Sequence, residues 1–199
     1  MDRLQTFDLV LLLALLAMFI VGYAQGVIRR LLGLGAVLFS LILGALLRPT
    51  VGQYLANEWT GIVPQYSYMV GFGAVFVAAV VTLSIGIQIS YRPAALFPKY
   101  PVLDELLGGL LGIVEGLLFI VAFLVITDPY FNLQTAKDHV GFGEFGLVRT
   151  VHDLLNPTLF ADILRHTVIP VLLTILGFVF QQDTRDAFAR ALTFLTARR

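Results

Sequence analysis

The sequence predicts an all-α integral membrane protein with four transmembrane helices, followed by a C-terminal region of amphipathic, interfacial helices. Three observations predict this fold. Of the 199 residues, 58% are hydrophobic and only 13% are charged, about half the charged fraction typical of soluble domains. Four apolar stretches each approach the ~20 residues that a helix needs to cross a ~30 Å hydrocarbon core. After residue 128 the apolar periodicity is interrupted by charges and prolines.

Each of the four stretches must be a helix, because the backbone groups of an open strand cannot be satisfied in lipid. The first stretch has the length of a signal-peptide core. However, Arg29 and Arg30 follow it and the segment before it is charge-balanced, which is the wrong asymmetry for a cleaved signal. We therefore expect an uncleaved first helix. The expected spans are residues 7–26, 31–47, 68–90 and 106–126.

The three connections between these spans differ in character. Residues 27–30 are so few that the first two helices should form a tight antiparallel hairpin. Residues 48–67 contain Trp59 and tyrosines, which prefer the headgroup level, so this loop should rest on the membrane surface. Residues 91–104 contain three prolines, which favour an extended, polar loop.

The Lys and Arg residues of the short loops predict the orientation, because cytoplasmic loops carry an excess of them. With four spans, the first and third connections share one side and hold four basic residues against three on the other. This excess predicts that both termini are extracytoplasmic. The basic residues on the expected cytoplasmic side are Arg29, Arg30, Arg92 and Lys99, and those opposite are Arg3, Arg48 and Lys137.

The region after Asp128 predicts a division into a transmembrane domain of residues 1–128 and an interfacial tail of residues 129–199. Asp128-Pro129 should end the fourth helix. In the next helix, the apolar residues should share one face and the polar residues the other. The apolar residues are Leu147, Val148, Val151, Leu154 and Leu155, and the polar ones are Arg149, His152 and Asp153.

Asn156-Pro157 should break the tail before a further helix over residues 158–180. Its apolar half, residues 168–180, is short for a span and is typical of an interfacial or re-entrant segment. A last helix is expected from an Asp183 N-cap. If residues 159–180 crossed, there would be five spans, and the tail arginines would join the first and third connections; this alternative stays open.

Glycines four residues apart predict close helix packing. Gly108, Gly112 and Gly116 line one face of the fourth span, and Gly22 and Gly26 repeat the spacing in the first. Such a face lets another backbone approach closely. Glycine is frequent in membrane helices, but three residues in register plus a second pair favour packing over accident.

Glu115 is the acidic residue deep inside a predicted span, ~15 Å along the helix from its start at 1.5 Å per residue. An ionisable group at that depth suggests a proton or ion site, or an internal clamp. No Lys or Arg is expected inside the spans. The structural reading is therefore a protonated carboxyl bonded to Ser40, Thr82 or Ser84, which lie at matching depth.

Two predicted helices begin with opposite charges at the same membrane face. Arg29-Arg30 precedes the second span and Asp104-Glu105 precedes the fourth. Acids suit a helix N-terminus and arginines do not, so the arginines need partners. These partners are either the two acids or lipid phosphates.

Catalytic, metal and cofactor sites are not predicted. The chain has no cysteine, which excludes disulfides, thiolate catalysis, cysteine-ligated zinc and cysteine-bound iron–sulfur clusters. His139, His152 and His166 form no metal-binding motif, although Asp162 lies four residues before His166. Nucleophile-elbow, phosphate-loop and dinucleotide fingerprints are absent from the sequence. The net charge of zero gives no argument for nucleic acid.

Several short motifs resemble the colicin V production protein (CvpA) family of small bacterial inner-membrane proteins. The likeness covers about residues 7–180. It implies four transmembrane helices, a bacterial inner-membrane location, no established enzymatic activity, and links to toxin export, envelope integrity and surface growth. Some relatives add an extracytoplasmic protease domain, but nothing like it occurs here. The motifs are Phe7-Asp8, Gly22, Gly26 and Arg29-Arg30-Leu31-Leu32, then Leu103-Asp104, Leu107-Gly108, Gly112 and Gly116.

Three functions follow as hypotheses. The first is a non-enzymatic accessory or scaffold protein that contacts a membrane-protein partner or copies of itself through helices within the lipid bilayer. The second is a small transporter or channel component that uses Glu115. The third is a minor subunit of a large bioenergetic complex.

Overall fold

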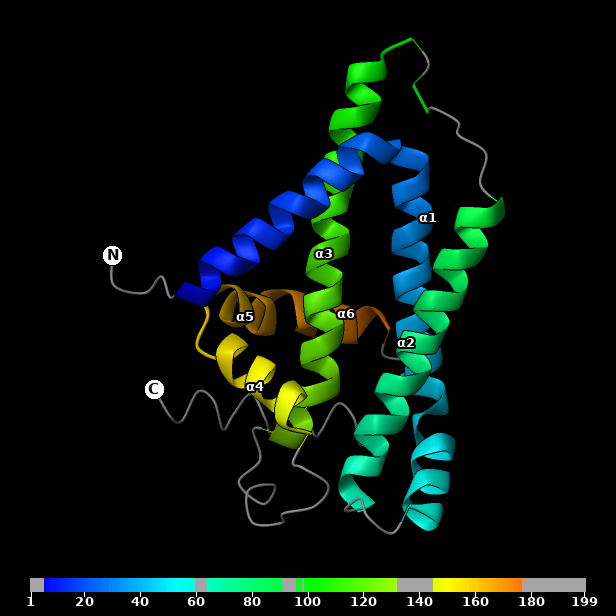
Figure 1. Cartoon of the computed structure of the whole chain (residues 1–199), viewed down its shortest axis with the longest axis vertical. Coiled ribbons are helices and arrows are strands. Elements are labelled where there is room, and N and C mark those ends of the chain that lie inside the picture. The colour runs from blue at the N-terminus through cyan, green and yellow to red at the C-terminus, as the bar shows by residue number, and fades with distance from the viewer. Residues whose placement is uncertain (1–5, 60–63, 91–95, 98, 132–144, 177–199) are drawn as a thin grey trace.

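In the computed structural model, the described residues are 6–59, 64–90, 96–97, 99–131 and 145–176, and their regular elements are all helices. Figure 1 shows the long helices and a bent chain of shorter ones. The expected all-α fold is therefore confirmed. The elements are α1 (Thr6–Glu58), α2 (Pro64–Ser90), α3 (Pro101–Phe131), α4 (Gly146–Leu155), α5 (Leu159–Ile163), the π-helical turn η3 (Leu164–Val168) and α6 (Ile169–Ile175).

The first long helix, α1, is broken at Gly26, where φ is 73° and ψ is 175°. Side chains with a Cβ rarely adopt such a positive φ, so glycine is the residue that permits the break. The two arms of α1 form an inverted V with the bend at its apex (Figure 1). These arms contain the expected spans 7–26 and 31–47. The expected loop over 27–30 is wrong, because the helix resumes directly after the bend.

The second arm continues far beyond the expected end of its span. α1 passes through Pro49 and ends at Glu58, so the expected surface loop over 48–67 is wrong for most of its length. The reason is tertiary contact with α2. A Cβ added at Gly52 would lie 2.9 Å from the Cα of Tyr68, and one at Gly71 would lie 2.9 Å from the amide nitrogen of Gly52.

The third long helix, α3, begins at Pro101, since the missing N–H of proline costs nothing in the first turn. It does not end at Asp128-Pro129 as expected but runs to Phe131. Pro129 lies so close to the end that it removes one hydrogen bond from the last turn alone. The helix therefore carries Asp128 on an ordered turn, where it is buried.

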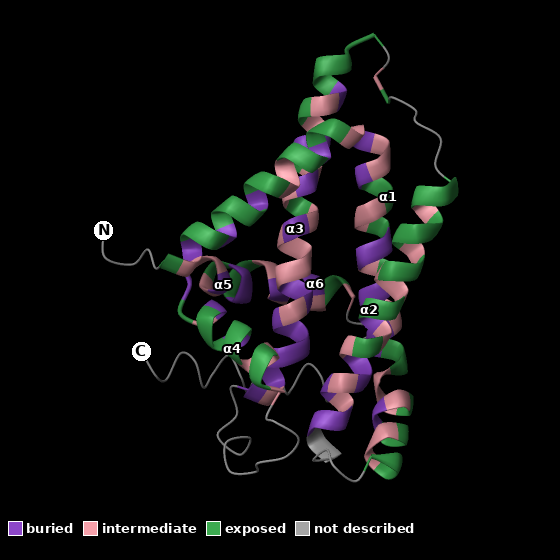
Figure 2. Ribbon diagram, in the orientation of Figure 1, coloured by how far each residue is buried: buried purple, intermediate pink, exposed green. Residues whose placement is uncertain are grey.

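By length and composition, three described helices could cross a membrane: α1, α2 and α3. A fourth span is possible if α4 and the helix over residues 159–175, bent by 82° to each other, count as one broken span. Figure 2 shows exposed residues along the outer sides of the long helices. Many of these are large and apolar, as in Leu12, Val77 and Ile85, which suits a lipid environment.

The tail bends at Asn156-Pro157, as the sequence indicated. Thr158 is the N-cap of the next helix, and its Oγ1 accepts a hydrogen bond of 3.2 Å from the Ala161 N–H. Contacts join α4 and η3 to α3, and α5 to α1. The expected Asp183 cap lies outside the described residues, and the division at residue 128 and the five-span alternative both stay predictions.

The expected division of α4 into an apolar and a polar face is wrong in one respect. His152 is buried together with Leu155, whereas Leu147, Val151 and Leu154 are exposed. The apolar stripe is thus split between the interior and the outside. Figure 2 shows both exposed and buried residues along α4.

Candidate functional site

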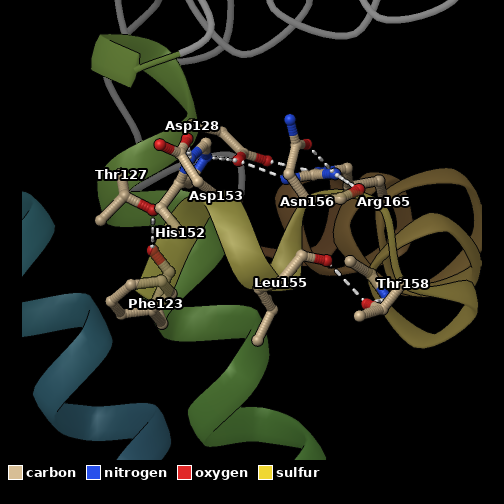
Figure 3. Close-up of polar contacts among 10 residues, drawn as sticks. Phe123, Thr127, Asp128, His152, Asp153, Leu155, Asn156, Thr158 and Arg165 are labelled. Carbon is tan, nitrogen blue, oxygen red and sulfur yellow. Dashed lines mark hydrogen bonds and ion pairs between the residues drawn. The ribbon is translucent and has the colours of Figure 1, made fainter. Parts of the chain in front are cut away.

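A cluster of buried charges joins the last turn of α3 to the tail (Figure 3). The Asp128 carboxylate accepts two hydrogen bonds from Arg165, from Nε to Oδ2 at 2.8 Å and from an Nη to Oδ1 at 2.7 Å. His152 Nε2 lies 2.9 Å from Oδ1. All three residues are buried: Asp128 and His152 are 1% exposed, and Arg165 is 3% exposed. Bidentate pairing of this kind is strong and geometrically specific.

The same arginine also holds the joint between the two tail helices. Its other Nη donates to the Asn156 Oδ1 at 2.8 Å and to the Asn156 carbonyl at 3.3 Å. Next to this joint, Thr158 Oγ1 donates to the Leu155 carbonyl at 2.7 Å (Figure 3). One guanidinium therefore ties α3 to both sides of the 82° bend.

Local structure explains how Arg165 reaches this position. It lies in the π-helical turn η3, and π-turns inside α-helices are rare and concentrate at functional sites. The imidazole of His152 must carry its hydrogen on Nε2 if it donates to a carboxylate, which only accepts. Its Nδ1 then faces Asp153 Oδ1 at 3.6 Å.

The first arm of α1 meets the tail close to this cluster. Asp8 is buried, and its Oδ1 accepts a hydrogen bond of 3.0 Å from the Leu159 N–H. Leu159 is the first residue of the tail helix that ends at Ile175. A carboxylate there is favoured by the positive end of the helix dipole. The cluster thus gathers the first arm of α1, the end of α3, and the tail.

A second buried ion pair lies nearer the bend. Glu115 on α3 accepts a hydrogen bond from the guanidinium of Arg30 on the second arm of α1, and both side chains are largely buried. Gly33 makes room for it, since a Cβ there would lie 2.6 Å from Glu115 Oε1. The expectation of no arginine at that depth is wrong, because the helix resumes at Val27 and carries Arg30 inside.

The expected hydroxyl partners of Glu115 do not fill that role. Ser40 is buried, but its Oγ has no hydrogen bond among the described residues. Thr82 and Ser84 are exposed on α2. The partner that the structure supplies is the Arg30 guanidinium.

The charges that begin the helices do lie at one end of the molecule, beside the bend. Asp104 lies against Gly26, where an added Cβ would be 2.5 Å from its Oδ2. Its Oδ1 accepts hydrogen bonds from the backbone N–H groups of residues 96 and 97, at 2.9 and 3.3 Å. Asp104 is buried, whereas Glu105 and Arg29 are partly exposed. Their cytoplasmic placement stays a prediction.

The glycine groups of the first and fourth expected spans lie against each other. A Cβ at Gly108 would lie 2.7 Å from the Gly22 carbonyl oxygen and 2.9 Å from the Gly26 Cα. A Cβ at Gly112 would collide with the Met18 carbonyl. At Gly116 the nearest atom would be a Leu15 methyl carbon at 3.0 Å. This glycine face therefore serves contact within the chain, between α3 and the first arm of α1.

One known protein family matches the part of the chain that holds these contacts. The family model described as Colicin V production protein matches residues 7–140, more than half of the chain. The chain belongs to this family. A search of curated proteins and a search of solved structures found no match.

The family match contains Asp8, Glu115 and Asp128 but ends before α4. The likeness expected as far as residue 180 is therefore shown to residue 140. The α3 carboxylates of the two buried ion pairs, Glu115 and Asp128, thus belong to the matched part of this colicin V production family member. Arg30, the partner of Glu115, lies inside the matched residues. His152 and Arg165, the partners of Asp128, lie beyond them.

The described residues of this family member include no group of three or more side chains that could hold a metal ion. His166 Nδ1 lies 2.9 Å from the carbonyl oxygen of Asp162 and 3.2 Å from its Oδ1. The two residues do share a helix face, four residues apart. His139 lies outside the described residues.

An open apolar groove separates α2 from α3. Its volume is about 610 Å³, and its lining includes Val148 of α4 and Phe145, the N-cap of that helix. A Cβ added at Gly73 would meet only an Ile126 methyl carbon at 3.9 Å, so the groove could accept a larger side chain there. Other lining residues are Ala74, Val77, Phe119 and Phe123.

Asp128, Arg165 and Asp8 were not predicted from the sequence as site residues. A signal for them existed. Asp128 ends an apolar span, and Arg165 lies in a largely apolar tail segment. Charges in such places are costly unless paired, so opposite charges there are candidates for each other. Spacing alone could not identify the pair, because 37 residues separate them.

Proposed function

We propose that this protein is a non-enzymatic accessory or scaffold protein of the bacterial inner membrane. Within its family it serves toxin production or export, or a related envelope role. It acts by seating a transmembrane helix of a partner protein, or of a second copy, in the groove between α2 and α3. The open groove is the observation that carries this proposal.

The internal glycine contacts support this choice of surface. Gly22, Gly108 and Gly112 already face each other's backbones within one chain, so a partner must use another face. The α2 side of the groove offers Gly73 and Ala74, which are the small residues that allow close helix approach in membranes.

The buried charges also favour a scaffold over a transporter. Asp128 is bonded to Arg165 and His152, and Glu115 is bonded to Arg30. We interpret each of these paired carboxylates as an internal clamp between helices, one of the roles open to a buried charge in a membrane helix. A minor subunit of a bioenergetic complex would use the same groove and differ only in its partner.

We further propose that the Gly26 bend faces the cytoplasm and that both termini are extracytoplasmic. The chain has no cysteine, so a single Asn57→Cys substitution near the end of α1 can be labelled selectively. A membrane-impermeant maleimide should label it in cells with an opened outer envelope and an intact inner membrane. Labelling only after the inner membrane is broken would contradict this orientation.

The groove itself is tested by affinity purification of the full chain in mild detergent, with mass spectrometry of co-purifying proteins. Gly73→Leu should fill the groove without a backbone collision, because only a methyl carbon at 3.9 Å lies near. We expect this substitution to remove a specific membrane-protein partner that the unchanged chain retains. Differently tagged copies of the chain test self-association in the same way.

Gly86→Leu is the matched control, because Gly86 is also on α2 and an added Cβ would meet nothing within 4 Å. It lies outside the groove lining and should leave the partner bound. Equal retention by both variants would refute the groove as the binding surface. The identity of the partner then separates a toxin-export accessory from a bioenergetic subunit.

A further inference from the structure

The amphipathic helix α4 has three distinct faces rather than two. At 3.6 residues per turn, Val148, His152 and Leu155 form one face, which contacts the rest of the protein. Leu147, Val151 and Leu154 form the next face around the axis, and they are exposed by 84%, 38% and 47%. The remaining polar face follows it, with Arg149, Thr150 and Asp153.

This order of faces is unusual for a helix surrounded by water. The inward face holds His152, while three large apolar side chains point outward. Burial of His152 is explained by its contact with Asp128 at 2.9 Å. The exposed face of Leu147, Val151 and Leu154 is stable only against an apolar medium outside the protein, such as lipid. The polar face beside it is stable only in water. A helix with both requirements suits a membrane–water boundary.

The position of α4 along the long helices points to the same boundary. Phe145, at the start of α4, lies 5.8 Å from the ring of Tyr66 near the start of α2. Tyr66 in turn lies 6.4 Å from Tyr130 in the last turn of α3. Arg48 donates a 2.9 Å hydrogen bond to the Tyr130 hydroxyl. Tyr66 and Tyr130 lie near the ends of α2 and α3, and tyrosines at the ends of apolar helices are typical of the headgroup level.

We propose that α4 lies in the membrane–water interface with Leu147, Val151 and Leu154 inserted into the lipid leaflet, and that Asp128 holds it there through His152. The surface partner is thus the bilayer itself, at the level where α3 ends. In this arrangement the exposed apolar face of α4 contacts lipid, while its polar face remains in water. This inference does not depend on the groove between α2 and α3.

The test uses single cysteines, which the chain lacks naturally. A fluorophore is attached at Leu147→Cys, Val151→Cys or Leu154→Cys in the purified full chain, in vesicles of phosphatidylethanolamine and phosphatidylglycerol. The matched controls are Thr150→Cys and Asp153→Cys, which are exposed on the polar face of the same helix. Quenching is measured with aqueous iodide and with nitroxide-labelled lipid.

We expect iodide quenching to be several-fold weaker at the three apolar positions than at the two controls, and lipid quenching to be stronger. Equal iodide quenching at all five positions would overturn the proposal, because the stripe would then face water. Protection of the apolar positions from both quenchers would also overturn it, since a protein surface would then cover them.

The anchoring role of Asp128 is tested with Asp128→Asn in the same labelled chains. In the asparagine variant an amide NH₂, which only donates, replaces the oxygen that accepts from Arg165 Nε, and the negative charge that holds Arg165 and His152 is lost. The contrast between Val151→Cys and Thr150→Cys should therefore shrink. Circular dichroism checks that the helices remain. An unchanged contrast in a folded variant would show that Asp128 does not hold α4 at the interface.

Discussion

The two buried ion pairs of this protein differ in how many segments each one joins. Arg30 and Glu115 connect the second arm of α1 to α3 by one bond, and the Arg30 Nε has no hydrogen bond among the described residues. Asp128 has both oxygens occupied and, through Arg165 and His152, connects α3 to both sides of the tail bend.

The two ion pairs also differ in the packing contacts that surround them. Near the bend, the glycine contacts already hold the first arm of α1 and the Gly26 bend itself against α3, so the Arg30–Glu115 pair, just beyond the bend, adds to an existing packing. The tail exposes much of its surface, but it also packs apolar residues such as Leu155, Ala161 and Ile169 into the core. The Asp128 cluster adds to this packing a geometrically specific attachment on both sides of the tail bend.

The largest effect is expected from Asp128→Ala. Removing one partner leaves Arg165 buried and uncompensated, which costs about 3–5 kcal/mol. Detergent-based unfolding and the protease sensitivity of the tail measure this loss. Asp153→Ala is the control, because that side chain is 67% exposed, and it should change stability by less than about 0.5 kcal/mol. A small effect of Asp128→Ala would reverse the ranking of the two sites.

A medium effect is expected from Gly112→Leu at the bend end of the molecule. The added side chain collides with the Met18 carbonyl, and overpacking of this kind costs about 1–3 kcal/mol. Cross-linking between cysteines placed on α1 and α3 should fall together with the unfolding midpoint. Leu110→Ala, on the exposed face of the same helix, should have little effect. Equal tolerance of the two changes would remove the packing argument.

The smallest effect is expected from Glu115→Gln. The amide keeps the shape of the carboxyl and an acceptor for Arg30, so the loss should be about 1–2 kcal/mol, with binding of the partner preserved. The double change with Arg30→Gln should recover part of it, because the uncompensated charge is also removed. If Glu115→Gln abolished activity in a folded protein, the residue would carry protons or cations and the transporter hypothesis would replace the scaffold.

Composition and apolar patterning determined the fold class, because a chain that is 58% hydrophobic with span-length apolar runs can satisfy its backbone in lipid only as helices. The glycine spacing likewise predicted a close-packed face, and the structure shows backbone contacts there. The break at Asn156-Pro157 was visible because the backbone chemistry of proline is local.

Helix ends and charge partners were decided by tertiary contacts. Local signals predicted ends at Leu47 and Asp128, but α2 supports the longer α1, and a late proline does not stop α3. Glu115 was predicted to meet hydroxyls, whereas the bend at Gly26 carries Arg30 to it. The 85 residues between these two partners make the reason plain: hydrophobic length and backbone propensity act along the chain, but the choice of a buried partner depends on which distant helix faces fold together.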